Sequence, residues 1–374
     1  MLGDFRQALQ YFDKHLSISK EVGDRAGEGC AYGNLGNVYR SLGDFHKAIE
    51  YHKKRLNIAK EVGTRHGEGR AYGNLGCAYQ GPGDYHHAIE YHKKELKICK
   101  EVGDIVGEGR VYGNLGNAYQ SLSDFRQAIG HSEKRLAIAK EVGEKPGEGR
   151  AYGNLGCAYH SLGDFQKAIH YHKKRLSIAK EVGSRDGEGR AYGNLGCAYL
   201  SLGNLRQAVE CHLKELSIAK EVGDRAGEGN AYGHLGNAYD KLGSFQQAME
   251  CLRQQLSITK AVGDRAGEGH AYGDLGLVYQ SLGNFREAIE YHKKALSIAN
   301  EVGERAGEGI ACYWLGHSFE SLDSLQDALG HYRSSVKLFD ITRALLTAED
   351  TWKISFRDLH QNAYTSLVRT LESS

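Results

Sequence analysis

Apolar residues recur along the chain with the spacing of amphipathic helices. Ala31, Leu35, Val38 and Leu42 lie at i, i+4, i+7 and i+11, which places them on one face of a helix. The following segment carries a second stripe of the same kind, formed by Phe45, Ala48, Ile49, His52, Leu56 and Ala59. The pattern therefore predicts two consecutive amphipathic helices.

Polar residues and glycines mark the ends of these helices. Asp24 and Asp44 each follow a glycine and can cap the helix that begins there. Gly43 can end the first helix at about Leu42, and the second helix is expected to end at about Val62. Such a pair cannot bury both apolar stripes alone, so we expect it to stack on neighbouring pairs.

The chain repeats this pair of helices every 40 residues. The segment 71–79 recurs unchanged at 151–159 and at 191–199. We predict a leading half repeat at 1–23, which holds a second helix only, and a C-terminal capping helix with a tail at 344–374. Eight repeats fill residues 24–343, the last of them divergent, and the first seven are 24–63, 64–103, 104–143, 144–183, 184–223, 224–263 and 264–303.

Glycines inside the first helix need a reason, because each costs roughly 0.5–1 kcal/mol relative to alanine. Gly36 lies on the apolar side, where the missing Cβ allows a close helix approach. Gly33 lies on the polar side, and there we expect a locally soft helix with exposed backbone.

The repeat resembles the tetratricopeptide repeat (TPR). The resemblance rests on Tyr32-x-x-Leu35-Gly36-x-x-Tyr39 followed by Gly43-Asp44-Phe45-x-x-Ala48, and it covers about residues 3–340. It implies an all-α solenoid, a right-handed superhelix of antiparallel helix pairs. Two features depart from the usual pattern: the small residue late in the second helix is replaced by Arg55, Glu95 or Arg135, and the terminal proline is missing.

These departures are similar to those of two groups with 40-residue repeats. One is the Partner-of-Inscuteable (LGN) family, which implies an adaptor in spindle orientation and G-protein signalling. The other comprises proteins like tetratricopeptide repeat protein 28, which implies the regulatory arm of a CHAT-domain, protease-like protein. The tail resembles the second group through the segments 340–346 and 349–358, which include Trp352.

Composition narrows the classes of function. Lys and Arg total 48 against 47 Asp and Glu, a net charge of +1 that gives no overall attraction to nucleic acid. No apolar run is long enough for a bilayer span, so we expect no membrane insertion. The eight cysteines form no C-x-x-C pair and are typical of reduced thiols in a cytoplasmic protein.

The polar face of the first helices is the candidate binding site. The resemblance places this face on the concave side of the superhelix, where TPR proteins bind extended peptides. Asn and Arg can hydrogen-bond a peptide backbone and its carboxylates, so the ladder favours an acidic, extended segment of a partner protein. The alternative is that the amides bridge adjacent helices. The predicted residues are Asn34, Asn37, Arg70, Asn74, Arg110, Asn114, Asn117, Arg150, Asn154, Arg190, Asn194 and Asn237.

The ladder changes after Arg190. Equivalent positions in successive repeats form a column, and the arginine column continues as Asn230, His270 and Ile310. The column of Asn34 changes at the same place to His234, Asp274 and Trp314. We therefore expect a basic, amide-rich floor in the central repeats, with Arg110 and Arg150 at its centre, and a more apolar floor in the C-terminal repeats.

Other repeated residues have plainer interpretations. The histidines of the column that begins at His52 lie among core positions and predict packing, not metal binding. The Lys53-Lys54 pair and its equivalents predict a solvated basic band, with weak attraction to RNA or to a membrane surface as the alternative. A catalytic site needs a unique constellation, whereas these residues recur in equivalent environments, so we expect neither catalysis nor a cofactor.

The first predicted helix lacks its partner helix. The apolar residues that would contact that partner include Phe5, Leu9 and Phe12. We therefore expect either preceding repeats or self-association through this end.

Overall fold

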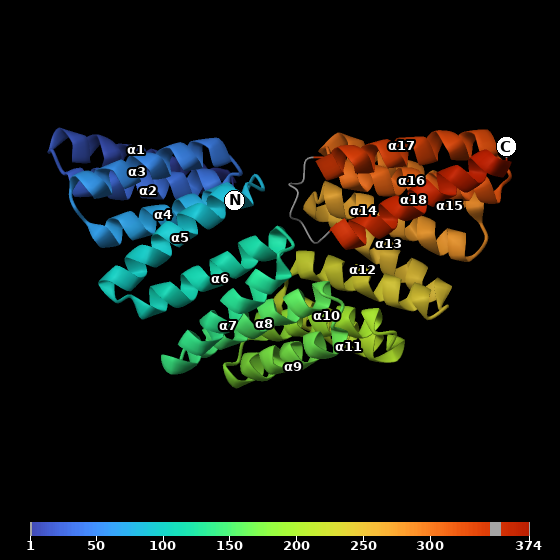
Figure 1. The fold of residues 1–374 in the computed structure, drawn as a ribbon, viewed down its shortest axis with the longest axis horizontal. Coiled ribbons are helices and arrows are strands. Elements are labelled where there is room, and N and C mark those ends of the chain that lie inside the picture. The colour runs from blue at the N-terminus through green and yellow to red at the C-terminus, as the bar shows by residue number, and fades with distance from the viewer. Residues whose placement is uncertain (1, 345–352, 374) are drawn as a thin grey trace. The chain divides into compact units, whose positions relative to one another are not determined.

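The computed structural model describes residues 2–344 and 353–373, and within them the regular structure is entirely α-helical, as predicted (Figure 1). The helices form two compact parts, Met1–Leu162 and Gly163–Ser374. The N-terminal part holds α1 (Leu2–Glu21), α2 (Arg25–Ser41), α3 (Phe45–Glu61), α4 (Arg65–Gln80), α5 (Tyr85–Val102), α6 (Ile105–Ser121), α7 (Phe125–Glu141) and α8 (Lys145–Ser161).

The C-terminal part continues the same alternation of first and second helices. Its helices are α9 (Phe165–Glu181), α10 (Arg185–Ser201), α11 (Leu205–Val222), α12 (Arg225–Lys241), α13 (Phe245–Val262), α14 (Arg265–Ser281), α15 (Phe285–Val302), α16 (Arg305–Ser321), α17 (Leu325–Ala344) and α18 (Lys353–Ser373). Within this part, each of the first helices α10, α12, α14 and α16 packs on the second helix that follows it and on the one before it.

The helix ends follow the sequence signals. Asp24 accepts a hydrogen bond from the Gly27 backbone N–H at 2.9 Å and so caps α2. The glycines that end the helices have the left-handed backbone that only glycine adopts without strain, with φ of 79° at Gly43. Ser123 and Asp323 hold the same conformation, each with φ of 60°, where other repeats have glycine. The turn geometry is thus kept even where the glycine is lost.

An ion-pair clamp joins the two helices of a repeat. Arg25, at the start of α2, donates to the buried carboxylate of Glu28 at 2.8 Å and also contacts Glu61 at the end of α3. The same arrangement recurs around Arg65, Arg185 and Arg265. In these four repeats the clamp ties the open end of the helical hairpin.

The glycines inside the first helices admit side chains from the second helices. A Cβ on Gly36 would lie 2.5 Å from Cε1 of His52, so this glycine permits the close approach that was predicted. The prediction of exposed, soft backbone at Gly33 is wrong. Gly33 is buried within a continuous helix, and a Cβ there would lie 2.9 Å from Cδ of Arg55. Gly33 therefore provides the space in which the long side chain of Arg55 lies.

The last helix packs on the repeat before it. Ala363 of α18 is fully buried against Val336 and Phe339 of α17. The segment 345–352, with Trp352 and much of the tail resemblance, lies outside the described residues.

Candidate functional site

A polar pocket of about 600 Å³ opens on the first helices of the N-terminal part. It collects five of the predicted residues from α2, α4 and α6, namely Asn34, Asn37, Arg70, Asn74 and Arg110. It also includes two side chains from the intervening second helices, Arg55 and Glu95. The pocket therefore extends beyond the predicted ladder and includes a column from the second helices.

Arg55 and Arg70 are neighbouring cations in this pocket. Burial, and secondly the charge of Arg70, lower the pKa of Arg55 below its usual value. Within residues 2–344 and 353–373, neither guanidinium has a carboxylate partner. Two like charges held together without an intervening anion favour binding of an anion from outside the chain.

Arg110 differs from Arg70, although the sequence placed them in one column. Its Nη2 donates to Oε1 of Glu95 at 2.6 Å, and the Glu95 side chain is only 1% exposed. The expectation of an unbroken basic floor from Arg70 to Arg190 therefore needs correction. The positive charge of Arg110 is balanced by Glu95 of the same chain. This happens because the column that holds Arg55 in one repeat holds Glu95 in the next.

The two remaining predicted arginines also have acidic partners, but exposed ones. Arg150 Nη2 lies 2.7 Å from Oε1 of Glu144, and Arg190 Nε lies 3.1 Å from Oδ1 of Asp186. Exposed pairs of this kind contribute only about 0–1 kcal/mol, so these arginines can exchange partners at small cost.

The asparagines of the ladder are half-buried except for Asn117, which is exposed, and some bridge adjacent repeats. Asn154 Nδ2 donates to Oδ1 of Asn117 at 2.8 Å. Asn237 Nδ2 donates to Oδ2 of Asp274 at 3.3 Å. At these positions the amides make the helix-to-helix contacts that the sequence left open as an alternative. The structure places Asn114 and Asn194 in the same half-buried column.

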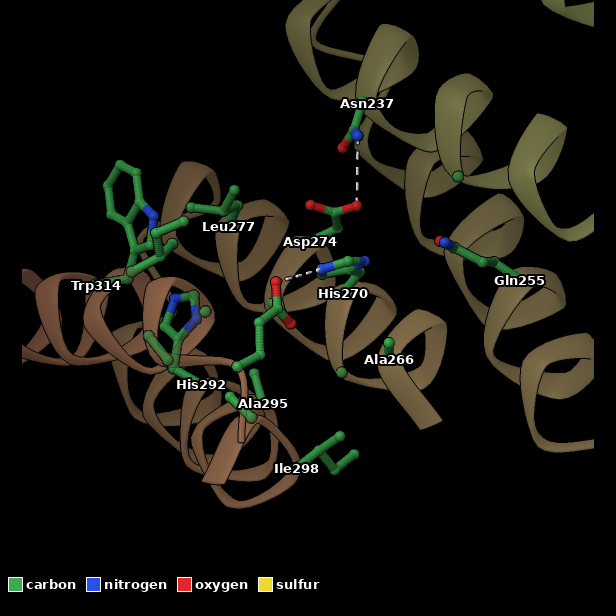
Figure 2. A pocket seen from close by; sticks show the side chains of 18 of the residues that line it. Asn237, Gln255, Ala266, His270, Asp274, Leu277, His292, Ala295, Ile298 and Trp314 are labelled. Atoms are coloured by element: carbon green, nitrogen blue, oxygen red, sulfur yellow. Dashed lines mark hydrogen bonds and ion pairs between the residues drawn. The ribbon is translucent and has the colours of Figure 1, made fainter. Parts of the chain in front are cut away.

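A second pocket, of about 410 Å³, lies within the C-terminal part (Figure 2). Its lining includes the apolar side chains of Leu277, Ala295, Ile298 and Trp314. Figure 2 shows Trp314 and Leu277 together at one side of the pocket and Asp274 facing Asn237 at another. The predicted change to a more apolar floor after Arg190 therefore has a structural counterpart in this part.

One carboxyl group in this pocket has an altered protonation equilibrium. Burial raises the pKa of Asp274 to about 6, against the opposing effect of the hydrogen bond from Asn237. Nearby, Nε2 of His270 lies 3.7 Å from Oε1 of Glu304. The pocket thus combines an apolar wall with one carboxyl group, that of Asp274, whose charge changes near pH 6.

The core histidines pack as predicted. His52, His92, His172, His212 and His292 are all at most 2% exposed. Burial lowers the pKa of His52 and of His292 to about 4, so both are neutral at pH 7. His212 has a further neighbour that the sequence analysis did not identify, His234, whose ring centroid lies 4.9 Å away.

Sequence reasoning missed the column of Arg55 and Glu95 as part of the site. The available signal was the replacement of the usual small residue by a long charged one, which was noted as a departure from the family pattern. Its meaning depends on Gly33 and Gly73, which leave room for these side chains to reach the pocket.

Among the described helices, none has both the length and the apolar character needed to cross a bilayer. The eight cysteines form no disulfide.

Solved structures share the fold at low sequence identity. The apo form of the quorum sensor NprR from B. thuringiensis matches with a TM-score of 0.64 and 16% identity, over 90% of this chain and 97% of that chain. Aspartyl phosphate phosphatase F from Bacillus subtilis matches with a TM-score of 0.63 and 18% identity, over 76% and 73%. A Rap protein in complex with competence and sporulation factor matches with a TM-score of 0.56 and 14% identity, over 98% and 99%.

No curated protein sequence matches the chain significantly. The tetratricopeptide repeat family model, in contrast, matches residues 1–61, 28–101, 108–181, 187–261, 227–301 and 268–341. These matches cover most of the chain and agree with its helix pairs and their 40-residue period. The chain therefore belongs to the tetratricopeptide repeat family.

Proposed function

We propose that the chain is a non-catalytic scaffold, cytoplasmic in location, that binds an extended acidic segment of a partner protein. The observation that carries this proposal is the pair Arg55 and Arg70, which lack an acidic partner among the described residues. Asn34, Asn37 and Asn74 surround the pair and offer amide donors and acceptors. A carboxylate of the ligand would lie between the two guanidinium groups, and its backbone would bind the amides.

The fold supports this proposal in a general way. Equivalent side chains recur every 40 residues, which suits a ligand that is itself extended. One of the similar structures is a Rap protein complexed with competence and sporulation factor. A repeat scaffold of similar fold has thus been solved with a bound factor.

The finer resemblances remain predictions. An adaptor of the Partner-of-Inscuteable type and the arm of a CHAT-domain protein would both use a protein-binding scaffold. The geometry of the pocket does not favour one over the other.

Fluorescence anisotropy with a labelled acidic peptide tests the proposal. The variant Arg55→Gln, Arg70→Asn introduces the residues that the chain itself has at the equivalent positions 255 and 230. A shielded charge-assisted hydrogen bond contributes about 1.5–3 kcal/mol, and about 1.4 kcal/mol is a tenfold change in affinity. We expect binding to weaken at least ~10-fold, and salt to weaken the wild type more than the variant.

The matched control is Lys53→Gln, Lys54→Gln, which removes the same charge from exposed positions on α3. We expect it to change affinity by less than about twofold. A second control is a peptide with every Glu replaced by Gln. If the lysine variant abolished binding, or if the neutral peptide bound equally well, the assignment to Arg55 and Arg70 would be wrong.

A further inference from the structure

One position in the C-terminal part brings together three side chains that bind transition metals. Cys197 of α10, His212 of α11 and His234 of α12 each offer one ligand atom, and these atoms lie within 4.8 Å of one another. Figure 1 shows these helices as neighbours in the chain and in space. A thiolate with two imidazoles is a ligand set that zinc prefers.

The histidines are held in an orientation suited to a metal. Oε2 of Glu215 lies 2.8 Å from Nδ1 of His212 and 3.2 Å from Nδ1 of His234. Glu215 lies on the same helix as His212, and the same oxygen, Oε2, contacts both imidazole rings. A carboxylate that accepts the Nδ1 proton leaves the Nε2 lone pair free, as in many zinc sites.

His212 also has an unsatisfied buried atom. Its side chain is fully buried, and its Nε2 has no hydrogen-bond partner. His92 and His292 have the same unpartnered atom, so this feature alone does not distinguish His212. What distinguishes His212 is that Cys197 and His234 bring two further ligand atoms close to its ring.

The combination occurs at one place because three columns coincide there. The repeat supplies the same cysteine and buried histidine elsewhere, as Cys77 and His92. At that place the third position is Asn114, an amide, in place of His234. Glu95 is the equivalent of Glu215. It does not orient a second imidazole ring, because its carboxylate pairs with Arg110 at 2.6 Å.

The residue at the position of Arg110 explains why Glu215 contacts both histidines. It is Asn230, and in the described part of the chain no arginine pairs with Glu215. Its carboxyl group is therefore available to orient the two rings.

We propose that Cys197, His212 and His234 bind one zinc-class cation, with Glu215 as the carboxylate that orients both imidazole rings. The ligand atoms of tetrahedral zinc lie about 3.4–3.6 Å apart, given Zn–S of about 2.3 Å and Zn–N of about 2.0–2.1 Å. Binding therefore needs side-chain movements of roughly 1 Å. His234 is 38% exposed, so the fourth coordination position faces solvent and is filled by water or by a group of a ligand.

The test is metal binding to the full chain after removal of metal with a chelator. Calorimetry with Zn²⁺ should give one tight site per chain. Co²⁺, as a spectroscopic probe, should give the tetrahedral visible bands and the thiolate charge-transfer band. Both signals should be present in the wild type and should be lost together when a ligand is removed.

Each variant can use a residue that the chain already has at the equivalent position. His234→Asn copies Asn194, Cys197→Asn copies Asn237, and His212→Leu copies Leu252. We expect each to abolish the tight site. Glu215→Gln copies Gln255 and, as a change in a positioning residue, should weaken affinity about 10–100-fold while the thiolate charge-transfer band persists at saturating Co²⁺.

Cys77→Asn is the matched control, because Cys77 and His92 occupy the positions equivalent to Cys197 and His212, whereas the third position is Asn114. It should leave the stoichiometry and affinity unchanged. Circular dichroism confirms folding, and if His212→Leu misfolds, the exposed change His234→Asn still decides the question. Undiminished binding in His234→Asn, or equal loss in Cys77→Asn, would overturn the proposal.

Discussion

His292 shows how a buried titratable residue couples folding to pH. It is 1% exposed, and its pKa is lowered to about 4 by burial. In the unfolded chain a histidine takes up its proton near pH 6.5. Between about pH 6.5 and about pH 4 the unfolded state therefore binds more protons than the folded state, and stability falls as the pH is lowered.

His292→Leu should reduce this dependence on pH. Leu252 occupies the equivalent position and packs against Gly236, so leucine fits the site. In the wild type, His292 accounts for a loss of up to about 3 kcal/mol in the free energy of unfolding between pH 6.5 and pH 4. The leucine variant should not show this loss. Urea unfolding at pH 7 and at pH 4.5 measures the difference. An unchanged pH slope in the variant would show that His292 is protonated in the fold.

At the same scale, the sequence predicts the roles of core residues better than those of charged ones. The histidine column could be assigned to the core because its spacing matches the apolar stripe. The ion pair of Arg110 and Glu95 could not be predicted from the sequence. These residues lie on different helices and are brought together only by the turn between them. The same limit applies to His234, whose neighbours come from α10 and α11.

Within a helix, two glycines three residues apart have opposite functions. In α14, a Cβ on Gly276 would lie 2.6 Å from Nδ1 of the buried His292. A Cβ on Gly273 would meet only Cβ of Ala295, at 4.0 Å. The helix contains both glycines at the same polar and apolar positions as the six repeats before it, but only one is required here by close packing.

Gly273→Ala should therefore stabilise the chain by about 0.5–1 kcal/mol, through higher helix propensity and lower entropy of the unfolded state. Gly276→Ala should destabilise it by about 1–3 kcal/mol, because the added Cβ would overlap the buried ring of His292 and force it to shift. Chemical denaturation of both variants measures the two effects. Equal effects of the two changes would contradict this account of the glycine columns.

The positions of the helices could be predicted from the sequence. The Gly-Asp pairs mark the turns, and the spacing of apolar residues marks the buried face of each helix. Gly33 is buried, contrary to the prediction, because the side chain of Arg55 on another helix covers it. A residue on the predicted polar face of a helix can thus be buried by a long side chain from a neighbouring helix.

Within the whole molecule, stability should be distributed among neighbouring repeats. Deleting 224–263 from the C-terminal part joins Gly223 to Asp264 and restores the Gly-Asp turn of the repeat. Because each repeat contacts only its neighbours, the shortened chain should fold with unchanged helicity per residue. Circular dichroism and thermal unfolding measure this.

Deleting 244–263 is the control for that experiment, because it removes α13 alone and leaves α12 without its partner helix. It should lower the thermal midpoint far more than the deletion of a whole repeat. A whole-repeat deletion that unfolded the entire C-terminal part would contradict a modular solenoid.

The identity of the segments at 71–79, 151–159 and 191–199 has a kinetic consequence. Native contacts are close in the sequence, as in the ion pair of Arg185 and Glu221, which are 36 residues apart, and such local topology favours rapid folding. Identical segments, however, offer a nascent helix several equivalent docking partners. Pairing with the wrong copy leaves at least one repeat as an unpaired loop. Closing this loop costs only slightly more entropy than forming the correct pair. Refolding should therefore include a slow phase in which misregistered chains open and pair again.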